Sequence, residues 1–282
     1  MTSSRGWRLE RPLALGAAGL VVGLAVLPAL LAVGLELSSA RAVGSLLLGA
    51  RIWELFGRSV GLATLVTLLA LAAGVPLGVL FARASYPLRR TLFALHLSVA
   101  FLPPFLPALG WFHVFGQEGL VGGPWTSHIL FGPVGVVLVL WSCFTPVVTA
   151  LTALGVSGVD PSLEEAARLV ARPARVAIGI LVPAARPAIV LGAVVVFALA
   201  FSELGVPMFL RVDVYPAVVF ARLGGMDFAP GEAAVYALPL ALLALGLLAL
   251  ERRFAGRRAT STLGHRRTAQ PPLFTGTARA VA

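Results

Sequence analysis

Long uninterrupted runs of apolar residues restrict the fold of this chain more than any other feature of its sequence. Crossing a bilayer takes roughly 20 apolar residues in a helix, and six runs of suitable length can be drawn between polar, glycine-rich or arginine-rich segments. Membrane β-strands would instead show shorter segments of alternating character. The sequence therefore predicts an all-α, polytopic membrane helix bundle with six transmembrane helices. We place these helices at Leu13–Leu35, Ser59–Ala82, Thr91–Phe115, Val134–Val156, Pro187–Leu210 and Ala233–Leu250.

Composition excludes several classes of protein. Of the 282 residues, 59% are hydrophobic and 12% are charged, whereas soluble domains average about 45–50% apolar and about 25% charged residues. The 22 basic residues are all arginine, so the chain lacks the lysine of a Walker A loop and cannot form a lysine Schiff base. The single cysteine, Cys143, cannot form an internal disulfide or a thiolate cluster. We expect no catalytic residue, no metal site and no cofactor.

The distribution of arginines predicts the orientation of the chain, because Lys and Arg in short loops stay on the cytoplasmic side of a membrane. With the N-terminus inside, only five of the 22 arginines fall in outer segments, namely Arg41, Arg51, Arg58, Arg211 and Arg222. We therefore expect a protein of a bacterial-type cytoplasmic (inner) membrane with both termini in the cytoplasm. Arginines that lie in short loops beside a bilayer also argue against a nucleic-acid partner.

The two ends of the chain should lie outside the helix bundle. Residues 1–12 would form a short cytoplasmic N-terminus, and residues 13–250 the six-span transmembrane domain. The first apolar run exceeds the core of a signal peptide, which is about 7–15 residues long, so we expect a retained span rather than a cleaved leader. The arginine- and proline-rich residues 251–282 should form a disordered cytoplasmic tail.

The cytoplasmic loop at residues 157–186 differs in composition from the other loops and should contain a short helix. Asp160 followed by Pro161 is typical of a helix cap and first turn. Ser162 with Glu165 three residues later fits a capping box. Two separate features therefore predict that a helix begins here.

This helix should carry a narrow apolar stripe and a charged rim. The stripe follows the helical spacing i, i+3, i+4 and i+7, at Leu163, Ala166, Ala167 and Val170. Glu164 stands four residues before Arg168 in the rim and can pair with it. Arg172 precedes Pro173 and should end the helix, with a second helical piece following to about Val182. The stripe would either enter a groove on a partner protein or pack on this chain's own inner surface or on lipid headgroups.

The same loop resembles the Glu-Ala-Ala loop of membrane permease subunits from binding-protein-dependent ABC importers of the methionine and maltose type. In that family the loop is closed by Leu-Pro and a later Pro. This chain has Glu165-Ala166-Ala167, then Val182-Pro183, then Pro187. It departs from the family in having Ala171 where glycine is usual, and its spacing to the Leu-Pro position is one residue shorter. The resemblance implies a type I ABC importer permease fold.

Partners and coupling residues follow from this resemblance. The loop would dock into a cytoplasmic ATP-binding subunit dimer and transmit its closure to the spans. The resemblance further implies an extracytoplasmic substrate-binding protein, the lipid bilayer, and a second permease half, which would be a homologous chain, another copy or a fused half. The implied coupling residues are Leu163, Glu164, Glu165, Ala166, Ala167, Val170, Ala171 and Pro183.

Three further segments are similar to the ferric-iron and thiamine branch of this family. They are GVPLGVLFARASYPLRR at 74–90, FLPPFLPALGW at 101–111 and FSELGVPMFL at 201–210. The similarity implies transport of ferric iron, thiamine or a related small solute. The chain would then form half of the translocation pathway and would not itself be an enzyme.

Candidate pathway residues lie in the third and fifth predicted spans. Glu203 is the only formal charge inside a predicted span, and an acid within the bilayer is costly enough to suggest a function. It follows Ser202, and either faces a water-filled path or reaches toward the interface. Pro103 and Pro104 permit a bend in the third span.

Two other functions compete with the importer. The first is a secondary transporter or channel without an ATPase partner, and the second is an intramembrane enzyme. His113, Glu118 and His128 lie in one outer segment, but polar residues of an exposed loop are more often simply solvated than metal ligands.

Overall fold

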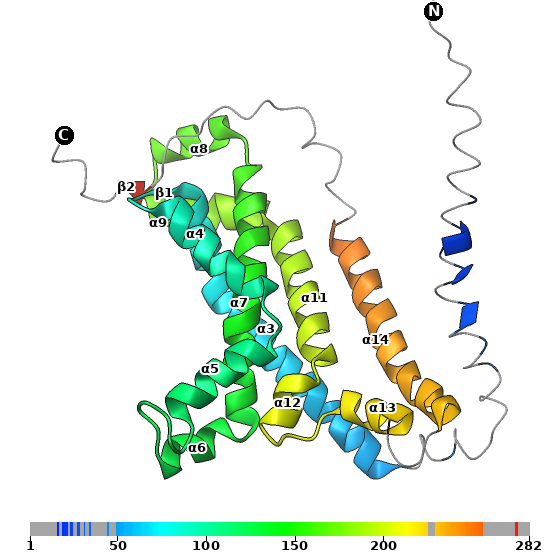
Figure 1. The fold of residues 1–282 in the computed structure, drawn as a ribbon. Helices are drawn as coiled ribbons and strands as arrows, with labels where there is room; N and C mark the ends of the chain where they lie inside the picture. The colour runs from blue at the N-terminus through cyan, green and yellow to red at the C-terminus, as the bar shows by residue number, and fades with distance from the viewer. Residues whose placement is uncertain are drawn as a thin grey trace, which may run out of the picture. The chain divides into compact units, whose positions relative to one another are not determined.

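The computed structural model describes residues 49–224 and 229–255, the pair Phe274–Thr275 and scattered positions between residues 16 and 44 (Figure 1). Within these ranges the fold is all-α apart from two strands of two residues each. This agrees with the predicted fold class. Residues 1–12, most of the predicted span Leu13–Leu35 and most of the predicted tail 251–282 lie outside the described residues.

Three described helices are long and apolar enough to cross a membrane. They are α3 (Ala50–Arg83), α7 (Pro133–Ser157) and α14 (Pro230–Ala255). The predicted span Val134–Val156 agrees closely with α7, whereas α3 begins at Ala50, ahead of the predicted Ser59. Two bent pairs of helices qualify as further spans, so the described residues hold up to five.

A sharp bend divides the third predicted span, Thr91–Phe115, which is therefore not one continuous helix. It consists of α4 (Arg89–Ser98), the 3-10 turn η1 (Val99–Phe101) and α5 (Phe105–Phe115). The two halves meet at 104°. Leu102 takes an extended conformation with φ −79° and ψ 135°, as a residue before proline prefers. Pro103 and Pro104 also lack backbone donors, and the short helix α6 (Pro124–Leu130) then leads into α7.

The fifth predicted span, Pro187–Leu210, is also interrupted. Its elements are α11 (Arg186–Ser202) and α12 (Gly205–Phe209), followed by α13 (Tyr215–Gly224). Glu203 lies between α11 and α12 in an extended conformation, with ψ 128°. Its side-chain oxygen accepts a hydrogen bond from the amide of Val206 at 3.2 Å, which satisfies a donor left open at the start of α12. The helical stretch before α11 meets it at 70°.

The described chain divides into two compact units, residues 1–54 with 217–242 and residues 55–216 with 243–282. In the first unit, Val235 and Tyr236 of α14 are buried against Ile52 and Val218. In the second unit α7 is the central helix, with Val136, Leu140 and Val148 fully or almost fully buried. The second unit also holds the elements of the candidate site.

Helices α3 and α7 approach each other closely. A Cβ atom at Gly78 would lie 2.6 Å from Thr152 Cβ, and one at Gly74 would lie 2.7 Å from Val148 Cβ. Real Cβ atoms do not come this near to neighbours, so the contact depends on glycine at both positions. Trp141 of α7 adds a hydrogen bond from Nε1 to the Leu69 carbonyl at 3.1 Å.

Aromatic contacts join the two interrupted spans. Phe105 and Phe112 of α5 pack edge-on against Phe209 of α12, at centroid distances of 5.4 and 5.9 Å. Trp111 of α5 donates from Nε1 to Ser142 Oγ of α7 at 3.3 Å. The segments beyond both breaks therefore contact each other, and one of them is tied to the central helix.

The end of α3 carries the one strand pair of the described residues. β1 (Ala84–Ser85) follows Arg83 directly and pairs in parallel with β2 (Phe274–Thr275). Part of the predicted tail therefore lies beside the first residues after α3.

Candidate functional site

The predicted helix of the 157–186 loop is present as α8 (Pro161–Arg168), and Asp160 caps it. Asp160 Oδ1 accepts hydrogen bonds from the Ser162 amide at 2.9 Å and from the Ser162 hydroxyl at 2.8 Å. The predicted cap at Asp160 with Pro161 in the first turn is confirmed. The Ser162 hydroxyl donates to Asp160 rather than capping the helix itself, so the proposed capping box with Glu165 is not the device that begins α8.

The helix ends earlier than predicted. Leu169 is its C-terminal cap, and the amides of Val170 and Ala171 both bond to the Ala167 carbonyl, at 3.2 and 2.9 Å. Arg172 is extended with ψ 151°, as expected before Pro173. The predicted end at Arg172 was wrong because the turn at 169–171 ends α8 at Arg168, before the constraint that Pro173 places on Arg172.

A second helical stretch follows and returns the chain to the bundle. It is continuous through α9 (Pro173–Val176), the π-helical turn η2 (Ala177–Leu181) and α10 (Val182–Ala184), which contains Pro183. Val176, Ala177 and Leu181 are buried with Val79 of α3 and Val156 of α7. The predicted helical piece to about Val182 is confirmed.

The apolar stripe of α8 is largely exposed. Leu163 is 59% exposed, Val170 is 86% exposed and the neighbouring Leu169 is 87% exposed, while Ala166 is also on the surface. Ala167 is half-buried and packs, together with Ala171, on the small core at the ends of α3 and α7. Most of the stripe therefore faces away from the described part of the chain.

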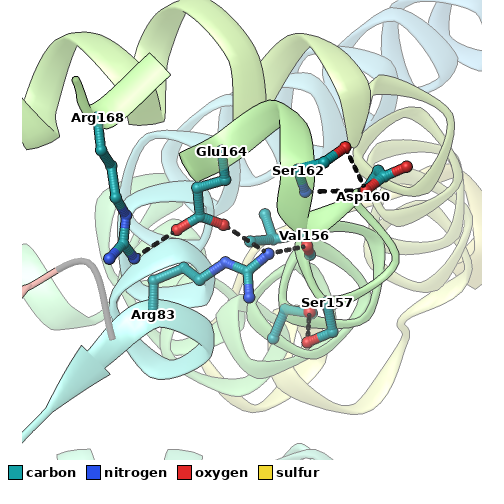
Figure 2. A network of polar contacts seen from close by, with 8 residues as sticks. Arg83, Val156, Ser157, Asp160, Ser162, Glu164 and Arg168 are labelled. Atoms are coloured by element: carbon teal, nitrogen blue, oxygen red, sulfur yellow. Dashed lines mark hydrogen bonds and ion pairs between the residues drawn. The ribbon is translucent and has the colours of Figure 1, made fainter. Parts of the chain in front are cut away.

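Glu164 is the buried side chain of α8, which places a carboxylate where an apolar residue is usual. Figure 2 shows it between two arginines: Oε1 accepts from Arg168 Nη2 at 2.7 Å, and Oε2 lies 3.0 Å from Arg83 Nη2. The side chains of Arg83 and Glu164 are each 3% exposed, and that of Arg168 is 27% exposed. A buried charge is tolerated in this way only when it is paired.

Arg83 also satisfies a carbonyl at the end of α7. Its Nη2 donates to the Val156 oxygen at 3.0 Å, one of the last carbonyls of a helix that ends at Ser157 and so lacks intrahelical partners. A cation is favourable at such a C-terminus. Sequence reasoning paired Glu164 with Arg168 and missed Arg83; the available clue was an arginine directly after the predicted span that ends at Ala82.

The candidate pathway residues lie at the two breaks. Ser202 is the exposed last residue of α11, and Glu203 is half-buried at the start of α12. Pro103 and Pro104 precede α5. The Phe105–Phe209 pair joins the segments that follow Pro104 and Glu203.

Possible metal ligands do not gather in the described part of the chain, where no three His, Cys, Asp or Glu side chains could hold one ion. His113 Nδ1 lies 2.8 Å from the Leu109 carbonyl oxygen of its own helix. Its ring is therefore engaged with local backbone.

Similarity to a protein of known family identifies the family of this chain. A protein of the archaeon Haloferax volcanii, named as a molybdenum ABC transporter permease, is 34% identical over 193 residues, covering 67% of this chain and 69% of the relative. The chain belongs to the permeases of binding-protein-dependent ABC importers. The resemblance inferred from the Glu-Ala-Ala loop is thus confirmed, although no family model matches this permease.

Two further relatives show how far the similarity extends. PhnU of Salmonella typhimurium, named for a 2-aminoethylphosphonate transport system, is 31% identical over 170 residues, or 55% of this permease and 59% of PhnU. The molybdenum permease ModB of Mycobacterium tuberculosis is 32% identical over 152 residues, or 52% of this permease and 57% of ModB. The match therefore spans less than two thirds of these two relatives.

Proposed function

We propose that this permease is the membrane subunit of an ATP-driven importer and that α8 docks into a cytoplasmic ATPase subunit. The observation that carries the proposal is the exposed apolar surface formed by Leu163 of α8 with Leu169 and Val170 of the turn that follows it, on a helix that Glu164 anchors to the bundle. Exposed apolar residues with a charged rim mark contact surfaces, and a short helix presenting them fits a groove on a partner.

The surrounding architecture is proposed on the same basis. Residues 13–250 form a six-span domain, and the loop 157–186 with both termini faces the cytoplasm. A second permease half completes the pathway, and an extracytoplasmic binding protein delivers the substrate. The family membership supports ATP-binding and substrate-binding partners in general.

The substrate we propose is a small oxyanion. The relatives are named for 2-aminoethylphosphonate and for molybdenum, and dissolved molybdenum is an oxyanion at neutral pH. Neither name supports ferric iron or thiamine, the solutes expected from the branch resemblance. Binding-protein-dependent uptake of radiolabelled molybdate or aminoethylphosphonate, compared with ferric iron and thiamine, tests this assignment.

Docking is tested by affinity purification of the whole chain from its own host in mild detergent. An ATP-binding subunit should copurify with the wild type and be lost from Leu169→Asp, because a carboxylate at this exposed site opposes insertion into an apolar groove. Retention of the ATPase by Leu169→Asp and by Val170→Asp would contradict docking through α8. Uptake in membranes that lack any associated ATPase would instead favour a secondary transporter.

The side of the membrane on which α8 lies needs a separate experiment. The only native cysteine, Cys143, is buried, so Leu169→Cys can be labelled in a Cys143→Ser background. An impermeant maleimide should label this site in inside-out vesicles and not in intact cells. Labelling from outside would overturn the orientation and the docking together.

A further inference from the structure

One nitrogen of Arg83 joins the ends of α3 and α7 to the middle of α8. Arg83 is the last residue of α3; its Nη2 lies 3.0 Å from Glu164 Oε2 on α8 and donates to the Val156 carbonyl of α7 at 3.0 Å. Figure 2 shows Arg83 between α8 and the end of α7. Segments that are 73 residues apart along the chain therefore meet at a single guanidinium.

Separating Arg83 from Glu164 should cost free energy. Both side chains are almost fully buried, so separating them leaves an uncompensated charge in a place that water reaches poorly. Arg83 Nε is buried without a hydrogen-bond partner in the described chain, so the guanidinium is held through Nη2, which contacts Glu164 and the Val156 carbonyl. The pair should therefore move as one body when α8 is displaced.

Little else fastens α8 to the spans. Its one fully buried residue is Glu164, and Ala167 adds a modest contact with the core at the ends of α3 and α7. The larger apolar side chains Leu163, Leu169 and Val170 face outward. Displacement of that outer face therefore reaches the bundle through Glu164, through the smaller contact of Ala167 and through the chain connections at either end of α8.

The two helices that Arg83 contacts, α3 and α7, are closely packed on each other. Helices α3 and α7 are in close contact through Gly74 and Gly78, and Val79 and Val156 share a buried cluster one turn from Arg83. Displacement of the Arg83 guanidinium should therefore move α3 and α7 together, and not only the Arg83 side chain.

We infer that Arg83 is a positioning residue that delivers the displacement of α8 to α3 and α7 through its ion pair with Glu164. This inference rests on the proposed docking of α8, because it concerns what happens after the ATPase has engaged that helix. Arg83 does not contact the ATPase; it determines whether movement of α8 reaches the translocation pathway.

The test compares uptake with ATP hydrolysis in proteoliposomes that contain the complex copurified from the native host and its binding protein. Arg83→Met keeps an unbranched apolar side chain but removes the guanidinium and its charge, and should lower substrate imported per ATP hydrolysed by roughly tenfold while the ATPase still copurifies. Glu164→Gln removes the charge of the other partner of the pair, on α8, and should also lower the substrate imported per ATP hydrolysed. Arg83→Lys, which keeps one charged donor, should restore part of the ratio.

Arg89→Met is the matched control. Arg89 follows Arg83 closely in the sequence and donates from Nη1 to the Ala84 carbonyl at 2.9 Å. This variant therefore also removes an arginine and its hydrogen bond to a backbone carbonyl. It should keep the wild-type ratio. Hydrogen exchange on the isolated chain in detergent adds a readout without the ATPase: Arg83→Met should speed exchange in residues 163–168 and leave the middle of α7 unchanged.

The outcomes separate the two proposals. If Arg83→Met and Glu164→Gln import as much substrate per ATP as the wild type, or if α8 and α7 lose protection together, Arg83 has only a structural role and the inference is overturned. If the wild-type chain copurifies no ATPase, the docking proposal itself fails, and the inference falls with it.

Discussion

Glu164 and Glu165 are neighbours in the sequence, yet only Glu164 of α8 is turned into the bundle. Glu164 is 2% exposed and pairs with Arg83 and Arg168, whereas Glu165 is exposed. The two carboxylates therefore have separate roles, one toward the chain's own bundle and one toward whatever meets the outer face. Substitutions at these adjacent positions can distinguish anchoring from docking.

Glu165→Arg should abolish association with the ATPase and ATP-coupled uptake while the chain remains folded. A substitution at an exposed site changes the free energy of unfolding by within about 0.5 kcal/mol, but this one reverses a charge on the proposed docking surface. Copurification and uptake measure the effect, and Glu165→Gln, which only removes the charge, should lose less. Wild-type uptake by Glu165→Arg would argue for transport without an ATPase.

Asp160→Ala should destabilise α8 by about 1 kcal/mol, because the first amides of the helix lose their side-chain acceptor. The direct contact at risk is the hydrogen bond from the Ser162 amide. Hydrogen exchange in residues 162–165 should accelerate severalfold, and Asp160→Asn, which keeps an acceptor oxygen, should stay close to the wild type. Equal exchange in Asp160→Ala and the wild type would mean that the cap is dispensable.

Glu203→Gln should lower uptake without lowering membrane insertion. Glutamine keeps an oxygen that can accept from the Val206 amide, so this variant removes the charge and retains the contact at the start of α12. Glu203→Ala removes both and should lower thermal stability in detergent as well. Normal uptake by Glu203→Gln would exclude the charge from the pathway and leave Glu203 with a capping role.

Gly78→Ala should destabilise the packing of α3 on α7. The added Cβ would lie 2.6 Å from Thr152 Cβ and 2.8 Å from the Thr149 carbonyl oxygen, and overpacking of this kind typically costs roughly 1–3 kcal/mol. The control is Gly61→Ala in the same helix, where no atom lies within 4 Å of the new Cβ and alanine favours the helix. Thermal unfolding in detergent should rank Gly78→Ala well below Gly61→Ala, and equal midpoints would contradict the close approach.

The sequence predicted the straight spans better than the bent ones. α7 matches its prediction closely because Val134–Val156 has no charged residue and is bounded by Gly132 and Gly158. Hydropathy measures length and composition, so it cannot detect that Pro103 and Pro104 turn the chain by 104°. It also treated Glu203 as a charge within a span, whereas the residue lies between α11 and α12 and its side chain accepts from the Val206 amide of α12.

The sequence predicted where the helix of the candidate site lies and where it begins, but not which of its faces is buried. Asp160 and Pro161 determine where α8 begins, because capping is local to the sequence. Which side of α8 becomes buried depends on Arg83, which comes from another span and cannot be found by helical spacing. The sequence left open whether the apolar stripe enters a partner's groove or packs on the chain's own inner surface, and the buried ion pair turns Glu164 inward while Leu163 and Val170 stay exposed.

The hydrogen bonds of Trp111 and Trp141 offer a way to detect movements of the helices of this permease. They connect α5 and α3 to the same helix, α7, at adjacent residues: Ser142 accepts from Trp111, and Trp141 donates to Leu69. Indole emission shifts when the ring nitrogen exchanges a protein partner for water. Intrinsic fluorescence at these two rings, isolated by replacing the other three of the five tryptophans with phenylalanine, would report in real time when either helix separates from α7.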